Sequence, residues 1–199
     1  MVTTVKAKFK CSSERISQVP KDELKDIAFI GRSNVGKSSL VNMLTGIKGL
    51  AKVSGTPGKT KLINHFLIDD SWYLVDLPGY GYARVSKSTR GEFSKLILDY
   101  VLKCEKMHFL FVLVDSRLEP QKIDLNFLEL LGNNGIPFGI IFTKEDKLSQ
   151  AQLNRSVATY KQRLLEQWEE LPPMFISSSE KGKGREEILG FIEEALANY

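Results

Sequence analysis

The chain has 199 residues, 42% of them hydrophobic and 26% charged, a composition typical of one globular domain with a full core. Its net charge of +4 permits contact with nucleic acid but does not require it. The two cysteines, Cys11 and Cys104, have no metal-binding spacing, and no apolar run suits a signal peptide or a membrane span. We therefore expect a reduced, cytoplasmic protein with no membrane partner, one domain over residues 1–199, and a monomer by default.

The N-terminal segment, about residues 1–25, begins with alternating apolar and basic residues at positions 5–11. This alternation predicts a half-buried strand with a basic outer face, followed by a polar loop. Residues 26–30 then predict a short buried strand. Residues 39–44 have the pattern of a helix, which Gly46 ends.

Between that strand and that helix, residues 31–38 fit the phosphate-binding pattern G-x-x-x-x-G-K-[ST] at every fixed position. A strand, a glycine-bounded loop and a helix N-terminus direct backbone N–H groups at one point, where polyphosphate is the natural ligand. Lys37 is expected to reach the β- and γ-phosphates, and Ser38 to give its hydroxyl to Mg²⁺. The phosphate-binding residues expected here are Gly31, Arg32, Ser33, Asn34, Val35, Gly36, Lys37, Ser38 and Ser39.

Residues 47–61 form a break that is rich in glycine, proline and lysine. A connection of this kind directly after a phosphate site is more often functional than not, and the alternative is a solvated surface loop. Residues 62–68 and 72–76 then predict two strands joined as a hairpin, which implies one antiparallel strand. Helical spacing of apolar residues begins near Ser88 and continues to Cys104.

The second half of the chain alternates regularly between strands and helices. Apolar runs predict strands, and amphipathic patterns predict helices, at 109–114, 123–131, 138–142, 153–168, 174–177 and 188–196 in turn. This alternation predicts a three-layer α/β fold, with a mostly parallel six-stranded sheet, one antiparallel strand, and helices on both faces. Ligand-binding loops are expected at the carboxyl ends of the parallel strands.

The strand at 72–76 ends in Asp76, which with Leu77, Pro78 and Gly79 fits the pattern D-x-x-G. A carboxylate at this point can hold Mg²⁺ through water. A glycine N–H can approach a γ-phosphate closely because no Cβ intervenes. By itself D-x-x-G is a common turn, so it indicates a nucleotide site only together with the phosphate loop.

The strand at 138–142 leads into Thr143, Lys144, Glu145 and Asp146, which fit [NT]-K-x-D. Asp146 can accept two hydrogen bonds from the N1–H and N2 amino groups of guanine, which adenine does not offer in that arrangement. Lys144 can lay its methylene stem along the base. A solvated helix start is the alternative for this tetrapeptide alone.

A serine-rich turn, Ser177 to Glu180, follows the last predicted strand. Backbone N–H groups of Ser178, Ser179 and Glu180 are candidates to bind the guanine O6, with the register open by one residue. This turn is the least specific of the four motifs.

The four motifs appear in order, each at the end of a successive strand: a phosphate loop, D-x-x-G, T-K-x-D and a serine-rich turn. In this order the chain resembles the translation-factor-like P-loop GTPases. More narrowly, it resembles the EngB (YihA/YsxC-type) family of bacterial ribosome-associated GTPases, within the TrmE/Era/EngA/EngB class. Residues 31–40, 57–60, 76–83 and 143–146 carry the narrow resemblance, which covers nearly the whole chain.

The resemblance implies a P-loop GTPase fold and a GTP-hydrolysing enzyme with Mg²⁺ as its cofactor. Residues 47–61 would form switch I and residues 79–90 switch II, the two loops that the γ-phosphate orders. Thr60 would reach Mg²⁺ in the GTP state, with Thr56 as the competing threonine. The implied roles are catalysis for Lys37, Thr60 and Gly79, metal ligation for Ser38, Thr60 and Asp76, and further nucleotide binding for Gly58, Lys59, Leu77, Pro78 and Glu145.

The family is associated with assembly of the large ribosomal subunit and with normal cell division and septation. The resemblance therefore implies GTP and GDP as ligands, and the rRNA and ribosomal proteins of the large subunit as partners. The lysine-rich residues 48–61, together with Arg84, Lys87 and Arg90, fit an RNA-facing surface, and solvated switch loops are the alternative.

Hydrolysis would be attack of water on the γ-phosphate, catalysed by positioning and charge stabilisation. Ras-like enzymes carry a water-orienting Gln directly after D-x-x-G, where this chain has Tyr80. We therefore hypothesise slow intrinsic hydrolysis that a partner or a monovalent cation completes. Asn34 occupies the position at which potassium-activated relatives hold K⁺, whereas Arg32, the alternative charge donor, has a position that more often faces solvent.

Three functions fit these motifs. The first is a GTP-hydrolysing switch that acts on a ribosomal particle, and the second is a GTP-gated protein-binding switch in cell division with little catalysis. The third is a P-loop kinase or ATPase, against which the T-K-x-D pattern argues, as does the lack of a recognisable acceptor-binding lid. We expect the first.

Overall fold

The computed structural model describes residues 5–52, 62–81 and 93–198. Within these residues seven strands form one sheet in the order β1-β3-β4-β2-β5-β6-β7. The strands are β1 (Ala7–Ser13), β2 (Asp26–Gly31), β3 (Ile63–Ile68), β4 (Trp72–Asp76), β5 (Met107–Asp115), β6 (Phe138–Thr143) and β7 (Met174–Ile176). The helices are α1 (Lys37–Thr45), α2 (Lys95–Lys103), α3 (Lys122–Asn133), α4 (Gln150–Leu165) and α5 (Arg185–Ala197), with short 3₁₀ helices η1 (Ile16–Gln18) and η3 (Glu145–Lys147).

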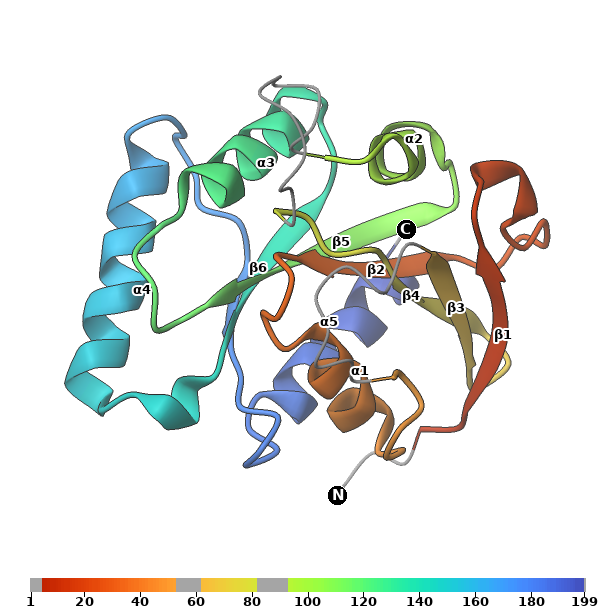
Figure 1. Cartoon of the computed structure of the whole chain (residues 1–199), viewed down its shortest axis with the longest axis horizontal. Coiled ribbons are helices and arrows are strands. Elements are labelled where there is room, and N and C mark those ends of the chain that lie inside the picture. The colour runs from red at the N-terminus through yellow and green to blue at the C-terminus, as the bar shows by residue number, and fades with distance from the viewer. Residues whose placement is uncertain (1–4, 53–61, 82–92, 199) are drawn as a thin grey trace.

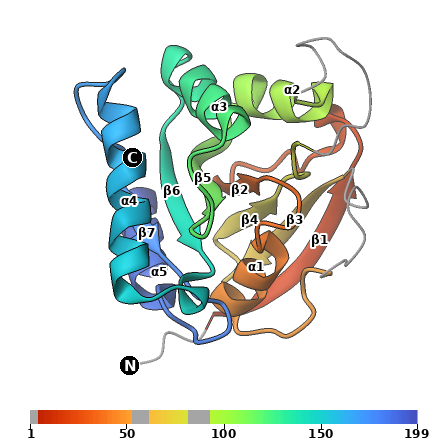
Figure 2. The same ribbon diagram turned by 60° about the vertical axis from the view of Figure 1, so that its left-hand side comes forward.

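Helices cover both faces of the sheet, which gives the molecule three layers (Figure 1). Apolar side chains of α2, α3 and α4 pack on one face, and those of α1 and α5 pack on the other. Figure 2 shows α2 and α3 above the sheet and α1 below it. Strand β2 is buried along its whole length because both of its faces are covered. The predicted three-layer α/β fold is confirmed.

Among the described strands, β3 alone runs against the others. It pairs antiparallel with β1 and with β4, whereas the remaining neighbours pair in parallel. The sheet therefore has one strand more than the six expected, because β1 adds itself to the outer edge of β3. The apolar side of β1 is only partly covered there. The ring of Phe9 meets the ring of Phe66 edge-on, with 5.9 Å between centroids, but Phe9 remains 56% exposed.

Register brings the carboxyl ends of the parallel strands to one edge of the sheet. Gly31, the last residue of β2, lies opposite Leu113 of β5. Asp115, the last residue of β5, lies opposite Thr143, the last residue of β6. The loops that follow these strands therefore start side by side, as the parallel arrangement predicts.

Three helix ends follow their local sequence. Gly46 ends α1 with a φ of 72°, as the sequence predicts. The Ser94 hydroxyl caps α2 by accepting a hydrogen bond from the backbone N–H of Ile97. Ser149 and Gln152 form a capping box at the start of α4. None of the described helices combines the length and apolarity that crossing a membrane requires.

Candidate nucleotide-binding site

The phosphate loop connects β2 to α1 in a shape that its glycines make possible. Gly36 has a φ of 102° and is the residue before the first turn of α1. A Cβ on Gly31 would lie 2.8 Å from the carbonyl oxygen of Leu113 and 2.8 Å from a methyl carbon of Val35, so only glycine fits. Asn34 also has a positive φ, 66°, which costs about 1 kcal/mol for a residue with a Cβ. The loop is thus preset before any ligand binds.

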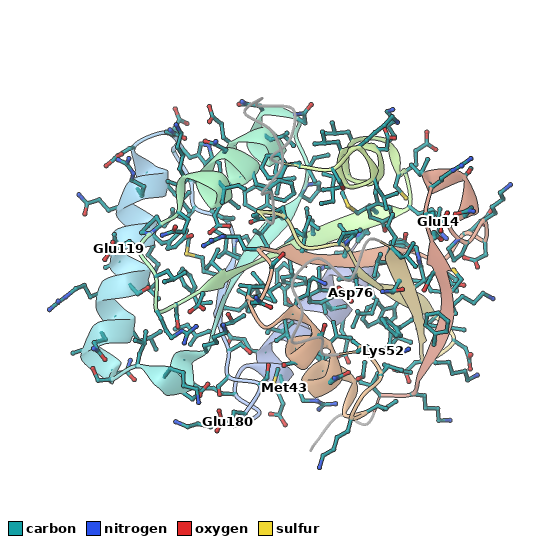
Figure 3. The ribbon with its side chains drawn as sticks, viewed as in Figure 1. Glu14, Met43, Lys52, Asp76, Glu119 and Glu180 are labelled. Atoms are coloured by element: carbon teal, nitrogen blue, oxygen red, sulfur yellow. The ribbon has the colours of Figure 1, made fainter. Side chains whose placement is uncertain are left out.

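The ammonium of Lys37 donates a hydrogen bond to the Asp76 carboxylate, which joins the phosphate loop to the end of β4. Both side chains are buried, with exposed fractions of 9% and 3% for the two residues. Burial lowers the pKa of Lys37 to about 7, and the carboxylate beside it favours the charged form. Figure 3 shows Asp76 near the middle of the molecule. Two of the expected site residues are therefore in direct contact.

The oxygen donors at this point suit Mg²⁺. Asp76 offers a carboxylate, and Ser38 follows Lys37 in the first turn of α1. Hard oxygen ligands with several retained waters are the usual surroundings of protein-bound Mg²⁺. The described residues hold no group of three or more His, Cys, Asp or Glu placed to bind a metal ion. The residues therefore fit an ion held partly by phosphate and water, and not a protein cage of carboxylates.

The D-x-x-G turn lies directly against the phosphate loop. Leu77 donates its N–H to the carbonyl oxygen of Phe29 at 3.0 Å. A Cβ on Gly79 would lie 3.2 Å from the backbone nitrogen of Ser33 and 3.3 Å from its Cα, which is closer than most neighbours allow. Glycine at this position therefore lets the two loops touch, with Pro78 between Leu77 and Gly79.

The T-K-x-D segment is fastened to the other side of the phosphate loop. The Thr143 hydroxyl donates to the carbonyl oxygen of Val35 at 2.7 Å. The Lys144 ammonium donates to the carbonyl oxygen of Asn34 at 2.8 Å and to the Asp115 carboxylate at 2.9 Å. These contacts bring together residues about a hundred positions apart in the chain, since Thr143 and Val35 are separated by 108.

Asp115 is a site residue that the sequence analysis missed. It ends β5, and it accepts hydrogen bonds from Lys144 and from the guanidinium of Arg117. Burial raises its pKa, but these bonds outweigh burial and hold the pKa at about 2. Its position at a strand end was a usable signal, but the residue belongs to none of the four motifs.

Asp146 stands at the end of the site where a base is expected. Its carboxylate accepts a hydrogen bond from the Ser178 hydroxyl at 2.7 Å and lies 3.0 Å from the ammonium of Lys147. The bond from Ser178 is the main cause that lowers the pKa of Asp146 to about 2. The carboxylate is therefore ionised and can only accept hydrogen bonds.

Backbone hydrogen bonds hold the serine-rich turn next to Asp146. Ser177 donates its N–H to the carbonyl oxygen of Phe142, and the backbone N–H of Ser178 donates to the carbonyl oxygen of Lys183. Gly184 closes the turn with a φ of 85°, and a Cβ there would lie 2.4 Å from the carbonyl oxygen of Ile176. The backbone N–H of Ser178 is therefore already bonded to Lys183. Of the three candidate donors to the guanine O6, Ser179 and Glu180 remain. Glu180 is also held, by the ammonium of Lys147 at 2.7 Å.

Several predicted residues lie outside the described part of the chain. These are Thr56, Gly58, Lys59, Thr60, Arg84, Lys87 and Arg90. Of the predicted switch segments, only residues 47–52 and 79–81 are described. The expectations for the remainder stay predictions.

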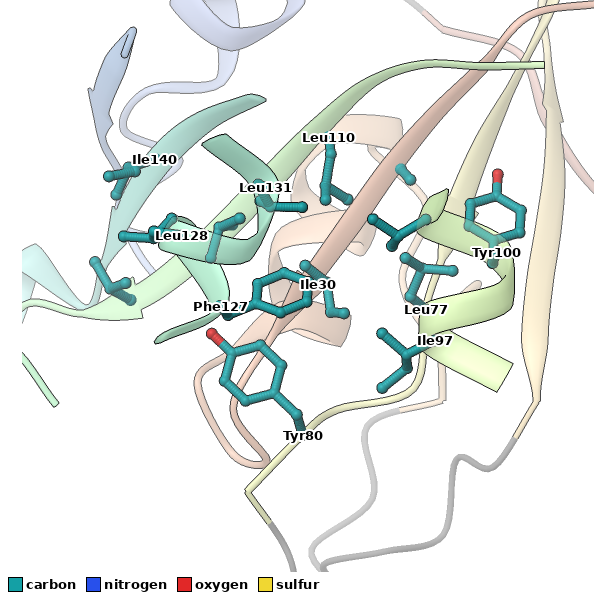
Figure 4. Close-up of a cluster of buried hydrophobic side chains, with 14 of the residues drawn as sticks. Ile30, Leu77, Tyr80, Ile97, Tyr100, Leu110, Phe127, Leu128, Leu131 and Ile140 are labelled. Carbon is teal, nitrogen blue, oxygen red and sulfur yellow. The ribbon is translucent and has the colours of Figure 1, made fainter. Parts of the chain in front are cut away.

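Tyr80 and Arg32 differ in how far they are buried. The Tyr80 side chain is 2% exposed and lies in the apolar cluster of Figure 4. Its hydroxyl donates to Asp124 of α3 at 2.7 Å. It therefore points into the core and not into the nucleotide site. Arg32 is half-buried, and its positive charge acts on Asp124. Asp124 is a second residue that the sequence analysis missed, although an acid on the buried face of an apolar helix was a signal.

Comparison with known proteins agrees with this geometry. Residues 26–144 match the family described as a 50S ribosome-binding GTPase. The chain is 61% identical over 188 residues to a probable GTP-binding protein EngB of Porphyromonas gingivalis, covering 94% of each chain. It is 60% identical over 187 residues to the protein of the same name in Bacteroides fragilis, covering 94% of this chain and 93% of the relative.

Solved structures show the same fold at lower identity. A crystal structure of a probable GTP-binding protein EngB aligns with a TM-score of 0.69 and 22% identity, covering 87% of this chain and all of that one. Aquifex aeolicus Era bound to GDP and aluminium fluoride aligns with a TM-score of 0.62 and 21% identity, over 86% of this chain and 56% of that one.

Proposed function

The chain belongs to the EngB family of GTP-binding GTPases, and from this premise we propose that it is a molecular switch in the assembly of the large ribosomal subunit, linked to normal cell division and septation. The printed family description, a 50S ribosome-binding GTPase, supports the ribosomal partner. In this proposal residues 1–199 form one GTPase domain that acts as a monomer in the cytoplasm. The observation that carries the nucleotide site is the junction of three segments: Val35 and Asn34 of the phosphate loop accept hydrogen bonds from Thr143 and Lys144, while Lys37 contacts Asp76.

The phosphate end of the site would work by placing positive charge and N–H groups around the γ-phosphate. The preset loop at 31–38 cradles the phosphates, and Lys37 exchanges Asp76 for phosphate oxygens when nucleotide binds. Ser38, Asp76 and Thr60 would hold Mg²⁺, which neutralises charge on the β- and γ-oxygens when it is bound. The backbone N–H of Gly79 would meet the γ-phosphate.

The base end would select guanine. Asp146 accepts hydrogen bonds from N1–H and the N2 amino group, and the Ser178 hydroxyl and Lys147 hold its carboxylate in place. With adenine the carboxylate would lack these donors, at a cost of roughly 2–5 kcal/mol. The N–H groups of Ser179 and Glu180 would face O6, and the stem of Lys144 would lie along the base.

Intrinsic hydrolysis would be slow. The residue after D-x-x-G, Tyr80, is buried and bonded to Asp124, so it cannot orient the attacking water. A partner on the ribosomal particle, or K⁺ at Asn34, would complete the site. Catalysis by this chain alone would then rest on Lys37 and the N–H groups of its two loops.

Titration calorimetry with GTP, GDP and ATP in the presence of Mg²⁺ tests the base-reading residues. We expect wild type to bind both guanine nucleotides and not ATP, and Asp146→Asn to lose guanine binding or shift it toward xanthine nucleotides. Asp99→Asn, on the exposed part of α2, is the matched control and should bind as wild type. Comparable binding of ATP by wild type would leave only a general P-loop nucleotidase.

Co-sedimentation with isolated large subunits tests the partner. Salt-sensitive binding that is stronger with a GTP analogue than with GDP is expected for an RNA-contacting switch. Normal GTP binding without co-sedimentation at low salt would favour the alternative, a GTP-gated protein-binding switch in cell division.

Hydrolysis rates in potassium and sodium buffers test the cation. A rate that is higher in potassium, and that Asn34→Ala reduces to the sodium level, is expected. Equal rates in the two buffers would reject K⁺ as the activator and leave the ribosomal partner.

A further inference from the structure

Tyr80 is the residue through which the D-x-x-G turn is attached to the phosphate loop. Its N–H donates to the carbonyl oxygen of Gly31 at 3.1 Å, and its carbonyl oxygen accepts from the N–H of Ser33 at 3.0 Å. These two bonds form a short parallel bridge directly after Gly79. Any rotation of the Tyr80 backbone would therefore move Gly79 relative to the phosphate loop.

The side chain of Tyr80 attaches the same residue to helix α3. Its hydroxyl donates to the Asp124 carboxylate at 2.7 Å, and both residues are buried, with exposed fractions of 2% and 3%. Its ring lies 5.0 Å from the ring of Phe127, one turn further along α3. Figure 4 shows these two rings in contact. A rigid helix thus determines where the start of the predicted switch II segment lies.

The first described residue beyond that segment packs against the same point on α3. Phe93, the first described residue after it, packs its ring 5.0 Å from Phe127 and 5.4 Å from Tyr80. A Cβ on Gly81 would lie 3.4 Å from Ile123 of α3 and 3.6 Å from Nε of Arg32. Helix α3 therefore contacts described residues at the start of the predicted switch II segment and just beyond its end, and Gly81 lies between α3 and Arg32 of the phosphate loop.

We propose that Tyr80 and Asp124 are positioning residues for GTP hydrolysis: their buried hydrogen bond holds Gly79 at the distance from the phosphate loop at which its N–H meets the γ-phosphate. This inference rests on the role proposed above for Gly79. In this proposal neither side chain needs to touch the nucleotide, because both act through the backbone of residues 79–80. The bond should matter for the γ-phosphate, which GDP lacks, and not for the rest of the nucleotide.

Three variants test the bond. Tyr80→Phe removes the hydroxyl and keeps the ring packing. Asp124→Leu removes the acceptor, and Asp124→Asn keeps an oxygen that can accept the same bond. Tyr100→Phe is the matched control, because its hydroxyl donates to Asp26 at 2.7 Å between two equally buried residues far from the nucleotide site.

Single-turnover GTP hydrolysis and the affinities for GTP and GDP are the readouts. We expect Tyr80→Phe and Asp124→Leu each to lower the hydrolysis rate about tenfold and to weaken GTP while GDP affinity stays within about twofold. Asp124→Asn should recover most of the rate. The double variant Tyr80→Phe with Asp124→Leu should be no slower than the slower single variant, since one bond is lost in each case.

Other outcomes distinguish a failure of the positioning role of Tyr80 and Asp124 from a failure of the role proposed for Gly79. Hydrolysis by Tyr80→Phe at the wild-type rate, or equal losses for GTP and GDP, would overturn the positioning role. Gly79→Ala tests the premise, because its Cβ would lie 3.2 Å from the backbone nitrogen of Ser33 and push residue 79 away from the phosphate loop. If this variant also hydrolyses GTP normally, the close placement of residue 79 is not needed and the premise fails instead. If Asp124→Leu does not fold, Tyr80→Phe and Asp124→Asn still decide, because each changes only one polar group.

Discussion

Two buried Tyr–Asp pairs stand at opposite ends of the parallel strands. Tyr100 donates to Asp26 at the start of β2, and Tyr80 donates to Asp124 beside the end of β2, each at 2.7 Å. The two pairs have the same chemistry and nearly the same burial. Figure 4 shows the two tyrosines on opposite sides of one apolar cluster. The two pairs therefore differ only in the parts of the fold that the residues around them contact.

In the part of the chain that the structure describes, the pair at the start of β2 contacts strands and helix α2 of the framework. Asp26 also lies 3.4 Å from Nε2 of His65 on β3 and 3.9 Å from the ammonium of Lys106, just before β5. Among the described residues, one oxygen of Asp26 and Nδ1 of His65 have no hydrogen-bond partner. This cluster joins strands to each other and to α2, and none of these contacts reaches residues 31–38, 79–81 or 143–146.

The pair at the end of β2 is next to a predicted ligand-binding loop, because Tyr80 directly follows Gly79 of the D-x-x-G turn. Tyr80 is bonded through its backbone to Gly31 and Ser33 of the phosphate loop. The functional role that we propose for this pair therefore depends on its place at the carboxyl ends of the strands, where loops must hold an external ligand. The predictions below test that distinction.

The largest expected effect is at the nucleotide end. Lys37→Ala should weaken GTP binding about 1,000-fold, equivalent to about 4 kcal/mol, because a cation that contacts phosphate oxygens is lost. Lys106→Ala, which removes the cation at the opposite end, should leave the affinity for GTP unchanged. Titration calorimetry of both variants measures the difference. Equal losses of GTP affinity in the two variants would contradict the proposed difference between the two ends of the strands.

A loss of stability of similar size is expected at the opposite end. Asp26→Ala removes the acceptor of the Tyr100 hydroxyl and the neighbour of His65, so about 3 kcal/mol of unfolding free energy should be lost. Urea denaturation measures this. GTP hydrolysis by the folded variant should match wild type, and a lower rate under conditions where the variant is fully folded would contradict the proposed division of roles.

The pH dependence of stability should reveal Asp124. Burial raises the pKa of its carboxyl from 3.8 to about 6, against the opposing effects of the Tyr80 hydroxyl and the Arg32 guanidinium, with Tyr160 also facing it. The folded protein therefore binds this proton more tightly than the unfolded chain does. The contribution to stability is present at low pH and is lost as the pH rises from about 4 to about 6, by at most about 3 kcal/mol.

Asp124→Asn isolates that contribution. We subtract the unfolding free energy of the variant from that of wild type, so that the contributions of the other carboxyls cancel. This difference should decrease as the pH rises from about 4 to about 6 and should stay constant above about pH 6. Urea denaturation at several pH values measures it. A difference that does not change with pH would show that the carboxyl titrates alike in both states.

The smallest effect is expected away from both ends. Asp99 accepts hydrogen bonds from Lys95 and Lys103 on the exposed side of α2. Lys95→Ala should change neither thermal stability nor GTP affinity measurably, because surface ion pairs contribute little. A clear loss in either measurement would show that α2 contributes more than the comparison allows.

Local chemistry made much of this protein predictable from its sequence. The phosphate loop is set by Gly31 and Gly36, whose contacts and φ only glycine tolerates, and the alternating pattern of strands and helices is set by residues close in sequence. Asp76 and Asp146 are found because short motifs place them at or just after the end of a strand.

Only the tertiary structure decided which elements lie together. That β1 extends the sheet depends on an open edge at β3, which no local pattern specifies. The roles of Asp115 and Asp124 depend on contacts with residues 29 and 44 positions away, Lys144 and Tyr80. A local pattern gives a residue's element and face, but its partners follow from the packing of helices on the sheet, and that packing is settled by the whole core at once.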